Sequence, residues 1–504
     1  MNNSLCMKLN VLFVAMVCVC VPLKAWADFY VAPRGDDTQA GTEAAPFATL
    51  ARAQVAARTV VAQGLKADLS VIVRGGTYRL TAPLHFGLED SGTEKYRVSY
   101  TAYPGETVQL SGGEAITGWT AQGNHQWTTT LPGATTWTFR QLFVDGERLP
   151  RGRFPNAPEL LHVKSVSEDF TEIVLDTVVS AEDLASSDAE LVMYQNWSIT
   201  RTGIASSQQD TLKLMNPMGW IGHGAATCAS AGKPTYLEHA LAFVDVPGEW
   251  YLDAKTRVLT YQAADGEDPN TRSFIAPKIE QWIVLEGNAG SPVRNLHFKG
   301  LEFVHTAWSR PEFGYNGIQA GHYGTRMPDP TYVLPVGIEF HYAQDCSVTD
   351  SRIAHTGAGG IGFGAGTRRN TVRGCELSDI GANGIMVGWR GKARTIGTVE
   401  GEDFYLSSDW LDRADVPVSN VVSGNLIRQP GAINHGCVGI FDAFAQGTRI
   451  AHNVIHDTPY TGISVGFRWN ESETSQRETL IEYNHVYDTM KMLADGGCLY
   501  TLGY

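Results

Sequence analysis

Two aspartates of this 504-residue chain, Asp442 and Asp495, stand where a carboxylate calls for a chemical explanation. Asp442 is the lone acid of a repeated column whose other members are Phe363, Val387, Val465 and Tyr500. A charge at an inward-facing position is costly unless it is paired or used. Asp495 ends an extended loop and precedes two glycines, which let the backbone approach a ligand closely. Two carboxyl groups, one protonated and one ionised, are what cleavage of a glycosidic bond requires.

Each aspartate also has an ordinary explanation: Asp442 could cap a turn, and Asp495 could belong to a common Asp-Gly turn. In stacked coils the two lie two rungs apart, or about 10 Å at about 4.8 Å per rung. That spacing favours the inverting separation of roughly 6.5–9.5 Å, although a residue on a loop could close in for retention. Other carboxylates in two long insertions compete for the role: Glu471, Glu473, Glu402 and Asp403.

Side chains suited to hold a sugar gather around the same loops. Aromatic rings offer flat faces for sugar rings, and basic side chains can bond hydroxyl or carboxylate groups. The candidate substrate-binding residues are His435, Trp389, Arg390, Tyr460, Arg468 and Trp469. Packing explains any one of them equally well, and it is their clustering that favours binding. His305 and His355 share another column, and we expect them to stack as structural residues.

A degenerate repeat from about Phe298 to Tyr504 must position these residues. The phrase around Ile353 and Ile361 returns 24 residues later around Leu377 and Ile385. Apolar columns alternate with polar positions at period two, which is the signature of strands. The two predicted inward columns are Phe303, Ile353, Leu377, Ile427, Ile455, Val486 and Ile361, Ile385, Ile440, Ile463, Cys498. This pattern predicts an all-β fold, a right-handed parallel β-helix, over an ordinary β-sandwich, because sandwiches do not repeat column by column.

A polar column accompanies the apolar ones. Its members are Ser351, Cys375, Asn425, Asn453 and Asn484. Asparagine tolerates the left-handed backbone of a turn, and stacked asparagine side chains can hydrogen-bond from rung to rung. The sequence therefore predicts an asparagine ladder along one corner of the coils.

The chain divides into four segments. Residues 1–27 resemble a secretory signal with a cleavage pattern at Ala25-x-Ala27, which predicts a secreted or periplasmic protein. Residues 28–115 contain a first strand, an Ala-rich helix from Ala51 that we expect to cap the open end, and the first coils. Residues 116–275 interrupt the repeat with Trp-rich alternating strands and predict an inserted, β-sandwich-like domain. Residues 276–504 hold the main repeats.

Composition restricts the partners. A net charge of −14 without a basic block argues against nucleic acid. No segment after the signal is long and apolar enough to span a membrane. Five cysteines follow the signal, and an odd number argues against a complete disulfide framework. No metal-ligand pattern occurs, and no cofactor is expected. The expected partner is a polysaccharide or oligosaccharide, and the oligomeric state stays open.

Several phrases resemble those of β-helix glycoside hydrolases. They begin at Tyr30 (Tyr-Val-Ala-Pro), Phe139 (Phe-Arg-Gln-Leu-Phe-Val-Asp-Gly), Trp250 (Trp-Tyr-Leu-Asp) and Ala494 (Ala-Asp-Gly-Gly-Cys-Leu-Tyr-Thr-Leu-Gly). The chain is similar to glycoside hydrolase family 141, which includes α-L-fucosidases and xylanases, and more distantly to family 120 β-xylosidases. The resemblance implies carboxylate catalysis on plant cell-wall glycans, with the acid pair mapping to Asp442 and Asp495.

Two other classes of function stay open. A polysaccharide lyase or epimerase would use a Lys or Arg base on an acidic glycan, but lysine is sparse in the coils. A non-catalytic glycan-binding β-helix would bind sugar unchanged after replacement of Asp442. Fold alone does not decide between these classes.

The last coil carries one more expectation. Residues 496–504 form a strand and its exit with no polar segment or helix after them. An uncovered coil exposes apolar side chains and unpaired strand groups. The sequence therefore predicts an incomplete β-helix, either truncated or sealed by another chain.

Overall fold

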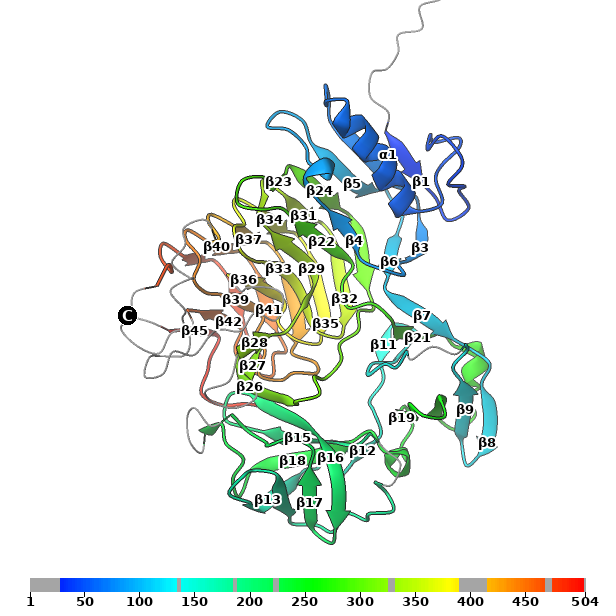
Figure 1. Ribbon diagram of the computed structural model, residues 1–504, viewed down its shortest axis with the longest axis vertical. Helices are drawn as coiled ribbons and strands as arrows, with labels where there is room; N and C mark the ends of the chain where they lie inside the picture. Colours follow the sequence, from blue (N-terminus) through cyan, green and yellow to red (C-terminus); the bar gives the residue numbers. More distant parts are fainter. Residues whose placement is uncertain are drawn as a thin grey trace, which may run out of the picture.

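The computed structural model describes residues 28–133, 137–184, 188–220, 226–324, 331–388, 415–466 and 474–502 (Figure 1). Within these ranges the coils build three parallel sheets, and each coil adds a strand to each sheet in turn. The first sheet contains, in order, β1 (Phe29–Val31), β2 (Leu69–Val73), β5 (Val98–Ala102), β24 (Leu296–Lys299), β31 (Ser347–Thr349), β34 (Thr371–Arg373), β37 (Val421–Ser423), β40 (Arg449–Ala451) and β43 (Leu480–Glu482).

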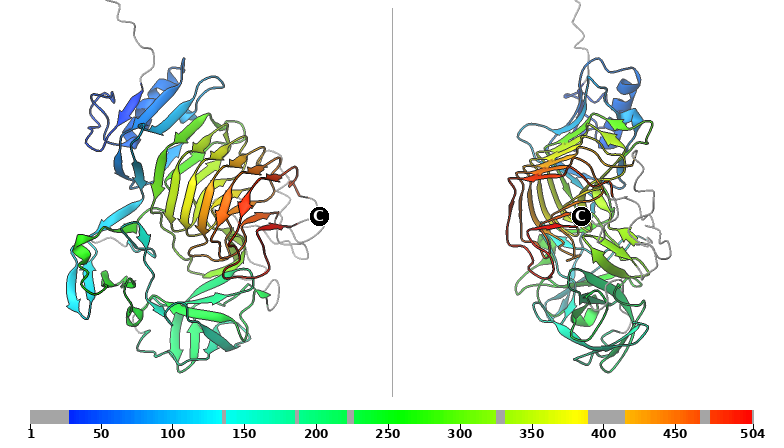
Figure 2. Two further views of the ribbon diagram at one scale, coloured as in Figure 1. Left: turned by 180° about the vertical axis from the view of Figure 1, so that it is seen from behind. Right: turned by 90° about the vertical axis from the view of Figure 1, so that its left-hand side faces the viewer.

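The other two parallel sheets follow the same progression. One contains β3 (Gly76–Arg79), β6 (Val108–Ser111), β25 (Leu301–Val304), β32 (Arg352–Thr356), β35 (Glu376–Ile380), β38 (Leu426–Pro430), β41 (Val454–His456) and β44 (His485–Val486). The other contains β4 (Leu84–Phe86), β22 (Ile283–Glu286), β29 (Val336–His341), β33 (Gly359–Phe363), β36 (Ile385–Val387), β39 (Ile440–Asp442), β42 (Ile463–Val465) and β45 (Leu499–Thr501). A short parallel pair, β23 (Val293–Arg294) and β30 (Ala343–Gln344), lies at a corner. Figure 2 shows the coils from behind and from the side.

The strand registers confirm the predicted apolar columns, with one exception. Ile353 pairs with Leu377, and Ile361 pairs with Ile385. In the last coil, however, Ile463 pairs with Leu499 and Val465 with Thr501. The predicted column members Cys498 and Tyr500 were therefore placed one residue too early. Because side chains alternate between faces, this slip exchanges the inward and outward positions of the strand.

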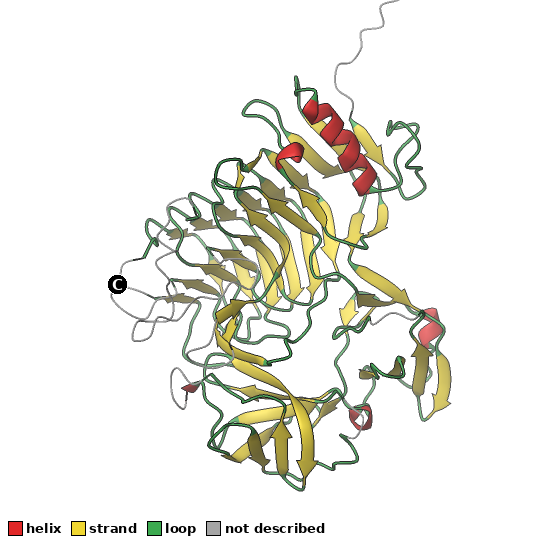
Figure 3. Ribbon diagram, in the orientation of Figure 1, coloured by secondary structure: helices red, strands yellow, loops and turns green. Residues whose placement is uncertain are grey.

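The helix α1 (Leu50–Ala62) covers the first coils, as the sequence predicted. It begins at the N-cap Thr49, whose side chain accepts from the main-chain nitrogen of Arg52. Its buried residues, among them Leu50 and Ala53, belong to the same hydrophobic core as the inward columns of the coils. Figure 3 shows this helix and a few short helical turns in a molecule whose regular structure otherwise consists of strands, so the prediction of an all-β fold is confirmed.

The insert is organised differently. The chain leaves the coils at β7 (Gly113–Ile116) and returns at β21 (Phe274–Pro277), and these strands pair antiparallel. They form a sheet with the hairpin β10 (Phe143–Val144) and β11 (Glu147–Arg148). A second sheet consists of β8 (Thr120–Gly123), β9 (Gln126–Thr130), β19 (Trp250–Leu252) and β20 (Val258–Gln262).

The centre of the insert is a barrel, and the predicted sandwich is wrong. The described strands β13 (Leu161–Val166), β14 (Glu172–Leu175), β17 (Thr211–Leu214), β16 (Ile199–Gln208), β15 (Glu190–Tyr194) and β18 (Pro234–Glu238) pair antiparallel in that order. The ring closes because β18 also pairs with β13. The strand β12 (Arg153–Phe154) pairs with β18, outside the ring.

An excursion from the coils ties the barrel to them. Between β25 and β29 the chain forms β26 (Tyr315–Gln319), β27 (His322–Gly324) and β28 (Thr331–Val333). The strand β26 pairs with β16 of the barrel. On the other side, the ring of His322 lies 5.1 Å from that of Phe441 on the outer face of β39. The barrel and the coils are thus joined through one continuous apolar cluster.

Candidate active site

Asp442 lies in the interior of the coils. It pairs with Val387 and Val465 and shares their inward parity, whereas its neighbour Phe441 packs in the outer cluster. The side chain is 0 % exposed. Its Oδ2 accepts hydrogen bonds from Gln476 Nε2 and Thr479 Oγ1, both at 2.9 Å. The lone acid of the column therefore holds the turn that follows β42, instead of facing a cleft as the sequence suggested.

The environment of Asp442 changes its ionisation. Burial raises the pKa of the carboxyl group, and the hydrogen bonds from Gln476 and Thr479 oppose that rise. Among the described residues no hydrogen bond of good geometry reaches the other oxygen, Oδ1, although the nearby Thr448 hydroxyl also opposes the rise of the pKa. Burial has the largest influence, and a buried carboxyl group favours its protonated form.

Asp495 has the opposite surroundings. It is exposed on the loop before β45, and no hydrogen bond or ion pair of its carboxylate occurs within the described ranges. Its φ is 58°, but Asp379, Asp457 and Asp488 adopt the same left-handed conformation at other corners of the coils. The conformation therefore belongs to the repeat, and the accessibility of the carboxylate is what distinguishes Asp495.

Two neighbours fix the main chain at Asp495. Tyr460 donates its hydroxyl to the Asp495 carbonyl oxygen at 2.9 Å, and burial raises the pKa of Tyr460 to about 12. Because its ring is 0 % exposed, Tyr460 offers no face to a sugar, which corrects the predicted binding role. A Cβ at Gly496 would lie 2.7 Å from the Tyr460 ring. This glycine is thus required by packing inside the protein, not by the approach of a ligand.

The barrel contacts the same loop. The main-chain nitrogen of Ala494 donates to the Asn196 carbonyl at 2.7 Å, in the turn between β15 and β16. Two residues earlier, Tyr194 stacks on His435, with ring centroids 5.5 Å apart and planes inclined by 4°. His435, Tyr460 and Asp495 therefore lie on the loops that lead into β39, β42 and β45, at one edge of one sheet. The sequence predicted this edge, but not its contact with the barrel.

The sequence reasoning missed a buried arginine–glutamate network beside His435. We use this name for Arg140, Arg151, Arg201, Arg310, Glu190 and Glu238. Arg140 makes a two-pronged ion pair with Glu190, and Arg310 Nε lies 3.2 Å from the same carboxylate. Arg151 and Arg201 donate to Glu238 Oε1 at 2.7 and 2.6 Å. The arginines come from three separate segments, so no local motif announces the network.

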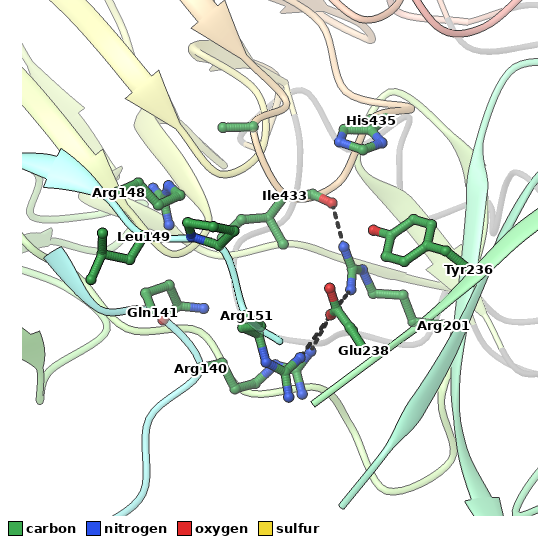
Figure 4. A pocket seen from close by; sticks show the side chains of 12 residues that line it. Arg140, Gln141, Arg148, Leu149, Arg151, Arg201, Tyr236, Glu238, Ile433 and His435 are labelled. Atoms are coloured by element: carbon green, nitrogen blue, oxygen red, sulfur yellow. Dashed lines mark hydrogen bonds and ion pairs between the residues drawn. The ribbon is translucent and has the colours of Figure 1, made fainter. Parts of the chain in front are cut away.

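A cavity of about 120 Å³ adjoins this network, and we name it the junction cavity (Figure 4). Its lining residues are Arg140, Gln141, Arg148, Leu149, Pro150, Arg151, Arg201, Tyr236, Glu238, Ala432, Ile433 and His435. Arg201 also donates to the Ile433 carbonyl at 2.9 Å, which attaches the barrel to the loop before β39. Of the predicted binding residues, His435 is the one that the described structure places in a cavity.

Other predicted residues lie outside the described ranges. These are Trp389, Arg390, Arg468, Trp469 and the competing acids Glu471, Glu473, Glu402 and Asp403, together with the predicted signal, residues 1–27. In the part that is described, no cluster of three His, Cys, Asp or Glu side chains could hold a metal ion. No helix there has the length and hydropathy of a membrane span.

Comparison with known proteins gives two informative findings. The sequence pattern described as the GH141 insertion domain matches residues 124–263, a range that contains the barrel. A solved structure titled "Glycoside hydrolase" is similar over 95 % of this chain and 86 % of its own, with 26 % identity and a TM-score of 0.81. Together these findings confirm the resemblance to glycoside hydrolase family 141.

A second solved structure is less similar. It is titled "The complex structure of XylC with xylose" and matches at 17 % identity and a TM-score of 0.47, over 91 % of this chain and 62 % of its own. That likeness is too low to bear on function. Among curated proteins, none matches the sequence significantly.

Proposed function

We propose that this glycoside hydrolase, similar to family 141, cleaves a plant cell-wall-type polysaccharide or oligosaccharide with an α-L-fucosidase- or xylanase-like specificity. The similarity to a solved glycoside hydrolase over 95 % of the chain carries the proposal. The framework is a right-handed parallel β-helix, in keeping with the three parallel sheets and the column registers.

Asp495 is the reacting carboxylate of this proposal. A catalytic acid, base or nucleophile must reach the bond that it cleaves. Asp495 is exposed, its carboxylate is not engaged in an ion pair within the described ranges, and its main chain is held by Tyr460. Such a group can act as a base on water or as a nucleophile at the anomeric carbon.

Asp442, the predicted partner of Asp495, has a supporting role in this proposal. Its Oδ2 is bonded to Gln476 and Thr479, and no part of the side chain is exposed. A substrate could reach it only if the turn carrying both partners moved. The second carboxylate of the pair is then sought among the acids that the sequence put forward as competitors, Glu471 and Glu473.

The test compares single variants in one hydrolysis assay. A panel of xylan, fucosylated pectin fragments and aryl glycosides, read out by released sugar, first identifies a substrate. Asp495→Asn is then expected to lower the rate by about 10²–10⁴-fold without a change in Tm. Asn is the matched replacement because it keeps the size of the side chain. Full activity of Asp495→Asn would refute the assignment.

The same assay separates the alternatives. Asp442→Asn should retain hydrolysis; if it is inactive and folded, the acid pair predicted from sequence is correct. Glu471→Gln and Glu473→Gln test the competing acids in parallel. Release of an unsaturated sugar, detected by its ultraviolet absorbance, would identify a lyase instead of a hydrolase. Sugar binding without any cleavage would identify a binding protein.

Export is a separate part of the proposal. The signal-like residues 1–27 predict a secreted or periplasmic enzyme whose mature chain begins at Asp28. N-terminal sequencing of the exported protein checks this, and a start at Met1 would contradict it.

A further inference from the structure

We propose that the junction cavity binds the carboxylate of an acidic sugar, a uronic acid unit of the glycan. The inference rests on the proposed function, because it names the chemical class of the substrate. It also places a binding group between the barrel and the loop before β39, next to the edge of the sheet that carries Asp495. Charge, unsatisfied donors and size all point to this ligand.

The charge of the network is unbalanced. Four arginines share two glutamates, and in the described ranges no third carboxylate lies within ion-pair distance of these four. The side chains of Arg151 and Arg201 are only 7 % and 4 % exposed, so water screens their charges poorly. The cavity is therefore lined by a buried excess of positive charge, which an anion would offset.

The neighbouring groups respond to this excess. Arg201 contributes, after burial, to lowering the pKa of His435 to about 3. Burial and, to a smaller extent, the charge of Arg140 lower the pKa of Arg151 to about 10. His435 is thus neutral at the cavity wall and can accept or donate a hydrogen bond without adding charge.

Several buried polar atoms at the cavity have no hydrogen-bond partner among the described residues. These are the Nε atoms of Arg140, Arg151 and Arg201 and the Nδ1 of His435. Leaving buried polar groups unsatisfied is unfavourable, and a carboxylate supplies two acceptor oxygens at once. Figure 4 shows Arg140 and Arg151, Arg201, and His435 around the cavity on separate segments of the chain. Arg201 belongs to the barrel and His435 to the loop before β39, so a ligand would contact both the barrel and the coils.

The size of the cavity selects among anions. A volume of about 120 Å³ is smaller than the apolar cavity of about 150 Å³ that holds benzene. It therefore accommodates a carboxylate and part of one sugar ring, but not a disaccharide. The rest of the glycan would extend from the cavity along the loops before β39, β42 and β45.

The first experiment uses the wild-type protein and matched small probes. Isothermal titration calorimetry with D-galacturonate is expected to show saturable binding, whereas D-galactose, the same ring without the carboxylate, should not bind. D-Galacturonate should also raise Tm. Inorganic phosphate is the competing arm: if phosphate binds and D-galacturonate does not, the site takes a free anion and the proposal is overturned. Equal binding of D-galactose overturns it as well.

The second experiment uses variants of the network. Arg151→Met removes a charge that lines the cavity and should weaken D-galacturonate binding by about tenfold or more. Arg310→Met is the matched control, since Arg310 belongs to the network but does not line the cavity; its binding loss should be clearly smaller. Equal losses of binding in both variants would show that D-galacturonate responds only to the overall positive charge of the network, and would refute a specific site in the cavity. The wild-type titration decides if either variant fails to fold.

The outcomes separate this inference from the proposed function. If the protein binds D-galacturonate but cleaves no glycan, the proposed uronate site is supported and the proposed hydrolase activity is contradicted. If it cleaves neutral glycans only and binds no uronate, the hydrolase activity is supported and the uronate site is contradicted. Asp495→Asn provides a further check, because it should lose hydrolysis and keep D-galacturonate binding.

Discussion

The coil interior and the junction with the barrel both bury polar side chains, but they satisfy them in different ways. In the asparagine column, Asn425 Nδ2 donates to Asn453 Oδ1 at 2.9 Å, and Asn453 Nδ2 donates to Asn484 Oδ1 at 2.9 Å. Each amide thus uses the equivalent residue of the next coil. At the junction, charged side chains from distant segments meet, and several of their donors have no partner within the described part of the chain.

This difference shows what repetition achieves. A polar group in a repeated column finds its partner one rung away, because the same residue type recurs at the same corner. A group at a junction depends on a long-range arrangement that only the folded domains create. Neutral amides in a column therefore stabilise the fold because the repeat itself supplies their partners. Buried ion pairs must first offset the desolvation of their charges.

The largest effect is expected from breaking the network. Glu190→Gln removes a carboxylate that is 1 % exposed and faces Arg140 and Arg310. The change leaves buried positive charge uncompensated and should lower the free energy of unfolding by about 3–5 kcal/mol. Chemical denaturation measures this. The matched control is Glu376→Gln, whose ion pair with Arg428 is 40 % exposed on both sides and should change stability by about 0–1 kcal/mol.

A smaller effect is expected from breaking the ladder. Asn453→Ala leaves the buried main-chain nitrogen of Asn425 without its acceptor and should cost about 1–3 kcal/mol. Asn453→Ser is the control, because Ser351 already serves in this column by accepting from the nitrogen of Leu301. The serine variant should retain part of the stability. If alanine and serine behave alike, the ladder contributes packing and not hydrogen bonds.

The two regions should also respond to pH in opposite directions. Burial raises the pKa of Asp442, so the folded protein binds this proton more tightly than the unfolded chain does. Its contribution is present at low pH and is lost as pH rises through the folded-state pKa. Asp442→Asn should remove that decline from a plot of unfolding free energy against pH. A wild-type profile that this substitution leaves unaltered would contradict the assignment.

The pKa of Glu190 is held well below its usual value: burial alone would raise it, but the charges of Arg140 and Arg151 outweigh burial. Its contribution is present above the unfolded pKa and is lost as pH falls towards the folded value. Glu190→Gln should therefore flatten the acid side of the same profile. Measured on the same plot of unfolding free energy against pH, the two substitutions distinguish the contribution of the coil interior from that of the junction.

The smallest effect concerns the register of the last coil. Cys498 is exposed, whereas Cys346, Cys375 and Cys437 are buried and their thiol pKa values are raised by burial. A thiol reagent should therefore label Cys498 first in the native protein, and Cys498→Ser should abolish the fast phase. Stability should barely change. Slow labelling of Cys498 would restore the register that the sequence pattern suggested.

The sequence predicted what is periodic. The columns around Ile353 and Ile361 follow from alternation alone, and the stacking of His305 on His355, with centroids 5.5 Å apart, follows from their shared position. The register predicted for the last coil was wrong because its strand is short and the loop before it is long, so the pattern could not reveal an offset of one residue. The insert was predicted as a sandwich because alternating strands occur in sandwiches and barrels alike. The pairing of Leu161 with Thr235 closes the ring of strands and so distinguishes the barrel.

The candidate site was only partly predictable for the same reason. The edge with His435, Tyr460 and Asp495 could be found because it recurs from coil to coil. The inward direction of Asp442 was visible from its parity, but the sequence could not show that Gln476 and Thr479 occupy its Oδ2. The arginine–glutamate network has no period, and its members meet only after the barrel has docked.

The pairing of β7 with β21 has a consequence for how such molecules change. Gly113 lies opposite Pro277, so the chain leaves and re-enters the coils at neighbouring positions, about 4.8 Å apart across the two strands. A segment inserted between two such neighbouring strands does not displace the coil above or below it. The length and topology of the insert can therefore change, while the number of coils and their strand registers stay the same. An insertion between β7 and β21 can thus add a new binding surface without changing how the strands of the coils pair.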